Sequence, residues 1–285
     1  MKHIFFKIGF ICTLIIIGVI AVNSCKKKEP DTETQSSVDN SIAEGEYSRI
    51  AMPVNSIAVG DSGVQKGIFI PVPHNGCPDY WIDSTDIANG FPVTMWITYG
   101  QDTNSDGNVD IGCVDNDGKI RKGVIKAVFN SPWGTFPASM DMYLDSSGGY
   151  WVNNIRYKGK ISVTKNSPAS FHQIVTGGEC WTSDWNIKWN CDRTLTVYTG
   201  DIANPNDDYS LVSGTASGTN RKGKDFSVEI TNPLRREMGC RWIVSGTMTI
   251  KHPDLKDRTV DFGDGTCDDR ATVTIDGNTF EFHLQ

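Results

Sequence analysis

The sequence has little of what marks an enzyme, a metalloprotein or a nucleic-acid-binding protein. It has five histidines in 285 residues, and none lies in a His-Glu-x-x-His motif. It has no Gly-x-Ser-x-Gly motif, no phosphate-binding glycine loop and no Cys-x-x-Cys pair. The formal net charge of −7 argues against a nucleic-acid partner, which calls for a basic face. We therefore predict a non-enzymatic protein with no catalytic residues and no required cofactor.

Sustained helical periodicity is also missing after the first 24 residues. Short β-branched or aromatic runs such as 93–99, 124–129 and 242–250 alternate instead with turns rich in glycine, asparagine and aspartate. Runs of this length with turn residues between them are typical of antiparallel strands. The sequence predicts an all-β fold of mostly antiparallel strands with little helix, arranged as a sandwich or an extended sheet.

The one long hydrophobic run lies at the N-terminus, over residues 8–22, after Lys2 and Lys7. A basic start followed by an apolar core is the pattern of a secretory signal. A helix of this length covers about 23 Å, which is short of the roughly 30 Å hydrocarbon core of a bilayer. We therefore assign residues 1–24 to a signal peptide, with a retained membrane-anchored start as the alternative.

The end of this run, Val22-Asn23-Ser24-Cys25, resembles a lipobox, in which a small residue precedes the cysteine that is acylated. The resemblance implies that Cys25 carries fatty acyl chains such as palmitate, which attach the protein to a membrane. The following stretch is rich in Lys, Glu, Asp, Ser and Thr and poor in large apolar residues. Such a composition cannot bury enough surface to fold, so we predict a disordered tether over residues 25–46.

Six cysteines remain once Cys12 is removed with the signal and Cys25 is acylated. They are Cys77, Cys113, Cys180, Cys191, Cys240 and Cys267. An even number of cysteines in an exported chain indicates disulfide bonds rather than metal ligation.

An internal similarity suggests how these cysteines pair. Cys77 precedes Gly100 by 23 residues, and Cys240 precedes Gly263 by 23 residues, with a second cysteine and an acidic patch after each glycine. Chance spacing is the alternative to a true repeat. We interpret the pattern as two related β units that can pack as one domain, residues 47–165 and 166–285. The pairs that follow are Cys77–Cys113, Cys240–Cys267 and, as the remainder, Cys180–Cys191.

Several stretches resemble uncharacterised cell-envelope lipoproteins of the Bacteroidota. They are residues 97–100, 117–123, 213–221, 240–246 and 260–268, and the likeness covers most of residues 93–285. The resemblance implies a lipoprotein of the outer membrane, on either its periplasmic or its surface side. It implies no activity, because the group has no established function.

An acidic insertion between Gly100 and Cys113 is a candidate calcium site. Its oxygen-bearing residues at alternate positions are Asp102, Asn104, Asp106, Asn108 and Asp110, with Gly107 at the sharp turn. This order matches the front of a calcium-binding loop, although the twelfth position holds Cys113 instead of a carboxylate. The alternative is an acidic hairpin tip, because the same residue types are common in turns.

Trp181, Trp185 and Trp189 recur every four residues. On one extended strand this spacing places all three on the same face. If exposed, they would form a binding platform for a glycan or an envelope protein; if buried, they belong to the core.

These observations favour an outer-membrane-anchored lipoprotein that acts as a non-enzymatic binding or structural module, with the membrane as its partner through the lipid anchor. Two alternatives stay open. The first is a surface carbohydrate-binding or carbohydrate-active protein, and the second is a calcium-stabilised adhesin-like domain.

Overall fold

The computed structural model describes residues 31–61, 76–83, 86, 89–115, 117–146, 148–200 and 208–285. Asp31–Gln285 forms one compact unit. The predicted signal peptide and Cys25 lie outside the described residues. Among the residues that are described, no helix combines the length and the apolar character that a membrane crossing requires.

The described strands form one antiparallel sheet in which neighbours along the chain are mostly neighbours in space. The strands are β1 (Asp79–Ile82), β2 (Val93–Tyr99), β3 (Cys113–Val114), β4 (Ile120–Phe129), β5 (Ala138–Tyr143), β6 (Tyr150–Val152), β7 (Ile155–Ser167), β8 (Ser170–Trp181), β9 (Asn186–Tyr198), β10 (Tyr209–Thr219), β11 (Asp225–Glu237), β12 (Ile243–Lys251), β13 (Arg258–Asp264), β14 (Arg270–Ile275) and β15 (Asn278–His283). The prediction of an all-β, mostly antiparallel fold is confirmed, in its extended-sheet form.

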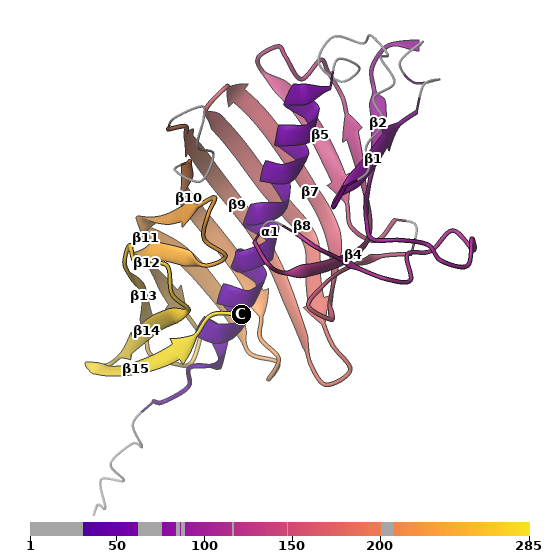
Figure 1. The fold of residues 1–285 in the computed structure, drawn as a ribbon. Helices are drawn as coiled ribbons and strands as arrows, with labels where there is room; N and C mark the ends of the chain where they lie inside the picture. The colour runs from indigo at the N-terminus through magenta and orange to yellow at the C-terminus, as the bar shows by residue number, and fades with distance from the viewer. Residues whose placement is uncertain are drawn as a thin grey trace, which may run out of the picture. The chain divides into compact units, whose positions relative to one another are not determined.

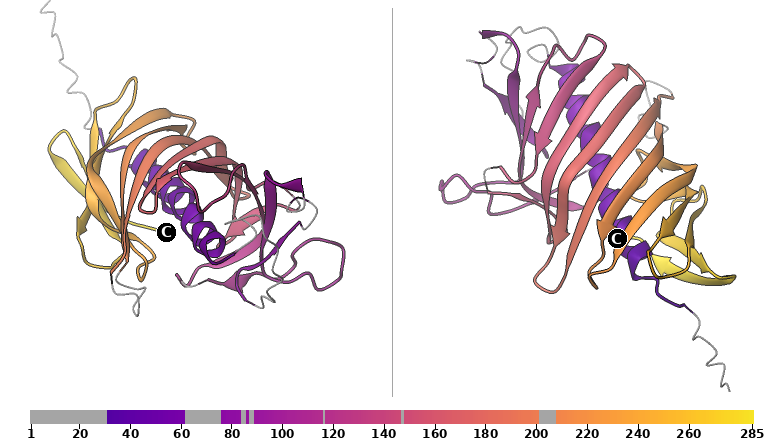
Figure 2. Two further views of the ribbon diagram at one scale, coloured as in Figure 1. Left: turned by 90° about the horizontal axis from the view of Figure 1, so that it is seen from above. Right: turned by 180° about the vertical axis from the view of Figure 1, so that it is seen from behind.

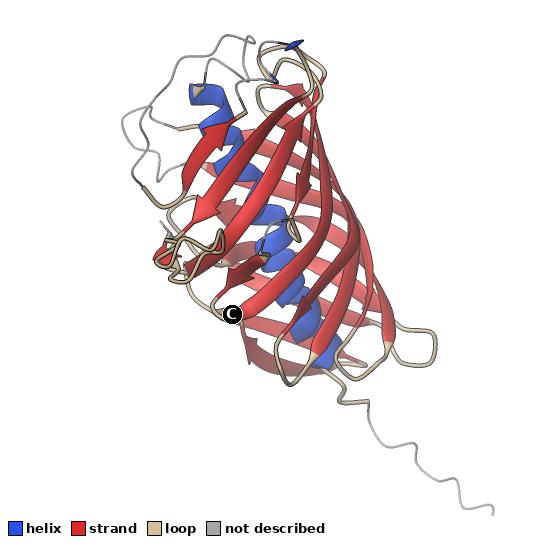
Figure 3. Ribbon diagram, turned by 90° about the vertical axis from the view of Figure 1, so that its right-hand side faces the viewer, coloured by secondary structure: helices blue, strands red, loops and turns tan. Residues whose placement is uncertain are grey.

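The sheet curls around a single long helix, α1 (Gln35–Gly60), which lies along the hollow of the curl (Figures 1, 2 and 3). Inward-pointing residues alternate with outward-pointing ones along each strand, as the pleat requires. In β2, for example, Val93, Met95, Ile97 and Tyr99 are buried, whereas the residues between them are partly exposed. The core is therefore the layer between the concave face of the sheet and the helix.

The predicted disordered tether is wrong for residues 35–46, which form the first half of α1. Composition predicts disorder because polar side chains in an isolated segment gain nothing from burial. Here the polar side chains of the helix are buried and bound by groups of the surrounding sheet. Asn40, for example, accepts a hydrogen bond of 2.9 Å from the Trp189 indole.

Tyr47 fastens the middle of the helix to the sheet. Its ring stacks on Trp189 with centroids 5.3 Å apart. Its hydroxyl donates to the carbonyl of Lys158 at 2.7 Å and accepts from the backbone N–H of Glu179 at 2.9 Å. These backbone groups are free because the β7–β8 ladder is interrupted next to Gly159, whose φ of 123° suits glycine. The irregularity in the sheet thus creates the binding point for the helix.

Two of the three predicted disulfide bonds are confirmed, Cys77–Cys113 and Cys240–Cys267. The third is wrong, because Cys180 and Cys191 are free and buried. In the β8–β9 hairpin Cys180 lies opposite Ile187, so Cys191 is four residues further along its strand. That offset corresponds to about 13 Å, whereas a disulfide needs Cα atoms within about 7 Å.

The boundary proposed between the two β units lies inside β7, which pairs along its length with β8. Residues 165 and 166 are therefore not a domain boundary. The internal relation between the two halves stays a prediction, because the sheet continues from β1 to β15 without a division.

Replacing Tyr47 by Ala is expected to destabilise the protein by about 3–5 kcal/mol, the usual cost of removing a buried aromatic ring. Val59 is 54% exposed on the same helix, and Val59→Ala is expected to change the free energy of unfolding by less than about 0.5 kcal/mol. Urea denaturation of both variants measures the difference. Equal, small effects would mean that the helix does not pack in the sheet.

Candidate functional site

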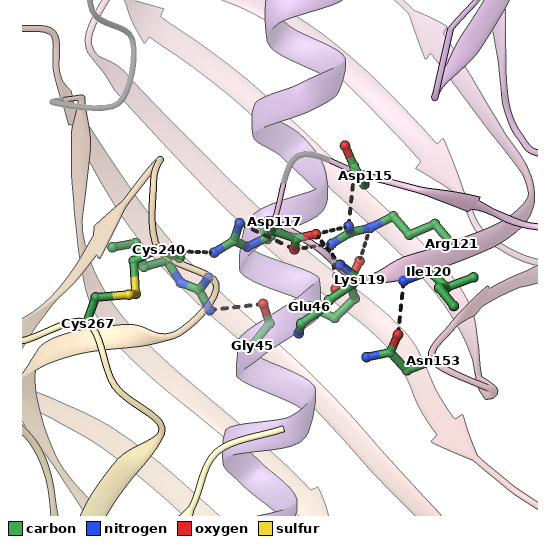
Figure 4. A network of polar contacts seen from close by, with 12 residues as sticks. Gly45, Glu46, Asp115, Asp117, Lys119, Ile120, Arg121, Asn153, Cys240 and Cys267 are labelled. Carbon is green, nitrogen blue, oxygen red and sulfur yellow. Dashed lines mark hydrogen bonds and ion pairs between the residues drawn. A yellow bond between two sulfur atoms is a disulfide. The ribbon is translucent and has the colours of Figure 1, made fainter.

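The polar interior is centred on Arg121 of β4 and Glu46 of α1, both almost fully buried (Figure 4). The Arg121 guanidinium binds the Glu46 carboxylate at 3.1 Å. The Tyr150 hydroxyl donates to the same carboxylate at 2.8 Å. Burial first, and the negative charge of Glu46 second, raise the pKa of Tyr150 well above its ordinary value, so the phenol stays a donor.

The turn between β3 and β4 supplies two more carboxylates to Arg121. Its Nη1 atom lies 2.6 Å from Asp117 and 3.0 Å from Asp115. Burial alone would raise the pKa of Asp117, but the hydrogen bonds and charge of Arg121 outweigh it and hold that pKa well below the ordinary range. Asp117 is therefore ionised at neutral pH, and Arg121 is enclosed by carboxylates.

Arg49 extends this network across the helix. It lies 3.4 Å from Asp117 and donates to the carbonyl of Cys240 at 2.6 Å. Cys240 is held in turn by its disulfide to Cys267 (Figure 4). The network thus joins three parts of the fold that are distant in sequence: β4, the helix and the segment after β11.

Arg236 of β11 differs from the other buried arginines. Arg121, Arg193 and Arg258 each have a carboxylate within 3.1 Å. No carboxylate of the described residues forms an ion pair with Arg236, although its side chain is only 6% exposed. Its Nη2 atom donates to the carbonyls of Glu44 and Gly45, while its Nε and Nη1 atoms have no hydrogen-bond partner.

Burial is the main cause that lowers the pKa of Arg236 to about 10, and the positive charge of Arg49 adds to it. The side chain still carries its charge at neutral pH. The negative charges of Glu44, Glu46 and Asp117 act on it from a distance, but no carboxylate of the described residues forms an ion pair with it, and a buried cation without a paired counter-ion is costly. The site therefore favours any anion that can reach the two free donors.

A cavity of about 220 Å³ lies beside Arg236. Arg49, Asp115, Asp117 and Glu237 form part of its polar wall, and its apolar wall comes from the helix and from the segments before β1 and after β11. The apolar lining residues are Met52, Pro53, Ile57, Pro78 and Met238. Chemically the site can hold a small organic anion, with its charged end on Arg236 and its apolar part against this wall.

The three tryptophans of the predicted platform are not brought together on one face. β8 ends at Trp181 and β9 begins at Asn186, so Trp185 lies in the turn between the two strands. Trp189 points inward and is fully buried. Trp181 lies on the outer side beside Arg156, and Trp185 is covered by Arg221 at 4.3 Å. The four-residue spacing does not place the three tryptophans on one face, because the hairpin turn lies between Trp181 and Trp189.

The acidic insertion is an exposed loop closed by the pairing of Gln101 with Ile111. Its carboxylates accept hydrogen bonds from the loop's own backbone, such as Gly107 N–H to Asp102 at 2.8 Å and Thr103 N–H to Asp110 at 2.9 Å. No group of three or more His, Cys, Asp or Glu residues within the described ranges is placed to hold a metal. Calcium binding by this loop stays a prediction, which a comparison of melting temperatures in chelator and in excess calcium tests.

The residues of the charge network were not identified from the sequence, although one signal was present. In β9 the inward positions are Ile187, Trp189, Cys191, Arg193 and Leu195. Arg193 is the one charged residue in that apolar series. A charge at an inward position of a regular strand indicates a buried partner, and Arg236 two residues after Leu234 follows the same rule.

Comparison of the chain with protein-family models, with curated proteins and with solved structures finds no match.

Asp117→Asn removes a carboxylate from the buried network and is expected to cost about 3–5 kcal/mol at neutral pH. Because the folded pKa of Asp117 is depressed, its contribution is present above the unfolded pKa of about 3.9 and is lost as the pH falls below it. The variant should therefore lose less stability than the wild type on acidification. Urea denaturation at neutral and acidic pH measures this, with the exposed Asp257→Asn as the control; identical acid sensitivity in all three proteins would contradict the assignment.

Proposed function

We propose that this chain is an exported, lipid-anchored envelope protein whose sheet-and-helix module binds a small organic anion and performs no chemistry on it. The export part of the proposal rests on the signal-like run and on the resemblance of Val22-Asn23-Ser24-Cys25 to a lipobox. The binding part rests on Arg236. The absence of a nucleophile–base pair or metal motif in the sequence supports binding rather than catalysis.

The single observation that carries the binding proposal is the unpaired, buried guanidinium of Arg236 next to a cavity. The free Nε–H and Nη1–H groups of Arg236 can each donate a hydrogen bond to an anionic oxygen. Asp115 and Asp117 line the same cavity and would repel a second negative charge. The preferred ligand class is therefore a monoanion, and the apolar wall favours a carboxylate with a short hydrocarbon tail.

Hexanoate is a suitable probe, with hexanol as its neutral counterpart. We expect calorimetric titration to detect hexanoate binding to the wild type and to detect much weaker binding of hexanol. Arg236→Met should weaken hexanoate binding by more than about tenfold, because the buried counter-charge is lost. Arg270→Met is the control, since Arg270 is exposed on β14 and does not line this cavity.

The same pair of variants separates a binding role from a structural one. If Arg236 is kept for a ligand, Arg236→Met removes an unpaired buried charge and should leave the ligand-free protein as stable as the wild type, or more stable. A loss of several kcal/mol in Arg236→Met, together with no hexanoate binding by the wild type, would mean that Arg236 only holds the helix carbonyls.

The lipid anchor is tested in cells. Cys25→Ser is expected to abolish incorporation of labelled palmitate and to release the protein from the membrane fraction. Cys12→Ser changes a cysteine that the predicted cleavage removes, so it should retain both. Labelling of Cys25→Ser at the wild-type level would contradict the assignment of the acylated cysteine.

A further inference from the structure

The outer face of the sheet carries aromatic and basic side chains that alternate from strand to strand. Trp81 of β1 lies opposite Trp96 of β2, which lies opposite Lys126 of β4. Lys126 lies opposite Tyr143 of β5, and Tyr143 lies opposite Lys160 of β7. The two indoles stack with centroids 5.7 Å apart, and Lys126 Nζ lies 5.4 Å from the Trp96 ring.

A second row runs across the same face. Lys122 of β4 lies opposite Trp151 of β6, Trp151 opposite Arg156 of β7, and Arg156 opposite Trp181 of β8. The cations lie 5.1 Å and 4.8 Å from the Trp151 ring, and Arg156 also lies 5.2 Å from the Trp181 ring. We call the two rows together the aromatic–basic face.

Three cations of this face are not held in an ion pair by any carboxylate of the described residues. Glu179 pairs with Lys158, and Asp141 with Lys160. Within the described residues, Lys122, Lys126 and Arg156 form no ion pair with a carboxylate. A cluster of unpaired positive charge is unusual in a chain whose formal net charge is −7. The face therefore attracts anions locally although the protein as a whole repels them.

The aromatic–basic face is hollowed at one end. A depression of about 340 Å³ lies between the stacked indoles of Trp81 and Trp96 and the acidic loop, where Asp102 and Asn108 face it. Trp81 is 54% exposed, so part of its ring is open to a ligand. The depression offers an indole surface, an amide and a carboxylate beside a positively charged surface.

We propose that the aromatic–basic face binds an acidic polysaccharide, with sugar rings on the tryptophans and sugar carboxylates on the unpaired cations. Strands of a sheet are about 4.8 Å apart, so the rows repeat aromatic and basic groups over several strands and suit an extended polymer. This site is separate from the Arg236 cavity, because the aromatic–basic face points outward and Arg236 points inward.

A flat anionic membrane is the less suitable partner. The acidic loop over residues 101–111 projects from the body beside β4 (Figures 1 and 2). It carries Asp102, Asp106 and Asp110 and is almost wholly exposed. Its projection would hold a planar surface away from the tryptophans. A flexible polymer can pass beside the loop.

Affinity electrophoresis of the full chain tests the proposal with defined probes. Polygalacturonate supplies both sugar rings and carboxylates, dextran supplies neutral sugar rings, and polyglutamate supplies carboxylates without sugar rings. We expect polygalacturonate to retard the protein and the other two to retard it little. Added salt should weaken the binding, because exposed charges are screened.

Two variants separate the roles of charge and ring. The triple variant Lys122→Gln, Lys126→Gln and Arg156→Gln should lose at least about tenfold in polygalacturonate affinity, which corresponds to about 1.4 kcal/mol. Trp81→Ala leaves the charges in place and should lose about two- to tenfold. Lys251→Gln on β12 changes an exposed cation elsewhere and should bind like the wild type.

Equal binding of polygalacturonate and polyglutamate, with no effect of Trp81→Ala, would overturn the proposal in favour of unspecific charge attraction. Tight binding to phosphatidylglycerol vesicles without binding to polygalacturonate would overturn it in favour of a membrane contact. Circular dichroism of each variant confirms that the fold is retained, which is expected because all the changed side chains lie on the outer face.

Discussion

The structure depends on the ion pairs and hydrogen bonds that hold a polar helix against the concave face of the sheet. α1 places acidic and amide side chains where most helices place leucine, and each needs a partner because water is excluded. Side chains and backbone groups of the sheet and its turns provide partners for most of them. Arg193 binds Glu44, Arg121 binds Glu46, and the sheet irregularity at Gly159 supplies backbone groups for the Tyr47 hydroxyl. Helix and sheet therefore specify one another's position through paired charges as well as through apolar packing.

This arrangement explains why the candidate binding site lies where it does. A network of paired charges stabilises only when every charge is matched, and a single unmatched group is costly. Arg236 is such a group: its hydrogen bonds go only to helix carbonyls, two of its donor atoms have no partner, and its side chain lines a cavity. Pro53, which lacks a backbone N–H, and Met52 give the same cavity an apolar wall from the helix. At Arg236 a buried charge without an ion pair coincides with accessible space.

The sequence predicted the strands well and the helix badly, for related reasons. Alternation of apolar and polar residues indicates a strand with one buried and one exposed face, and most strands of this sheet have two such faces. Helical periodicity indicates a helix that has one apolar face in the core and one polar face in solvent. α1 is buried on nearly all sides over most of its length, so its polar sequence predicts disorder instead of a helix. The repeated cysteine spacing predicts the Cys77–Cys113 disulfide correctly. The Cys180–Cys191 pair is predicted only because these two cysteines are left over, and the register of the β8–β9 hairpin keeps them apart. The cavity beside Arg236 forms where segments that are far apart in the sequence meet, so a local sequence pattern cannot predict it.

The pleat divides the cations of this protein into two chemically different sets. In β9, Arg193 points inward, and Lys188, five residues earlier on the same strand, points outward. An inward cation has lost its water, so it requires a carboxylate or a ligand held at a fixed geometry. An outward cation keeps most of its water, and where it lies against an aromatic ring the contact is weak enough to be exchanged for an anion at little cost. A fixed, dehydrated site suits one small molecule, and a hydrated row of charges and rings suits a long polymer. The two proposed ligand classes thus follow from which side of the sheet the arginines and lysines occupy.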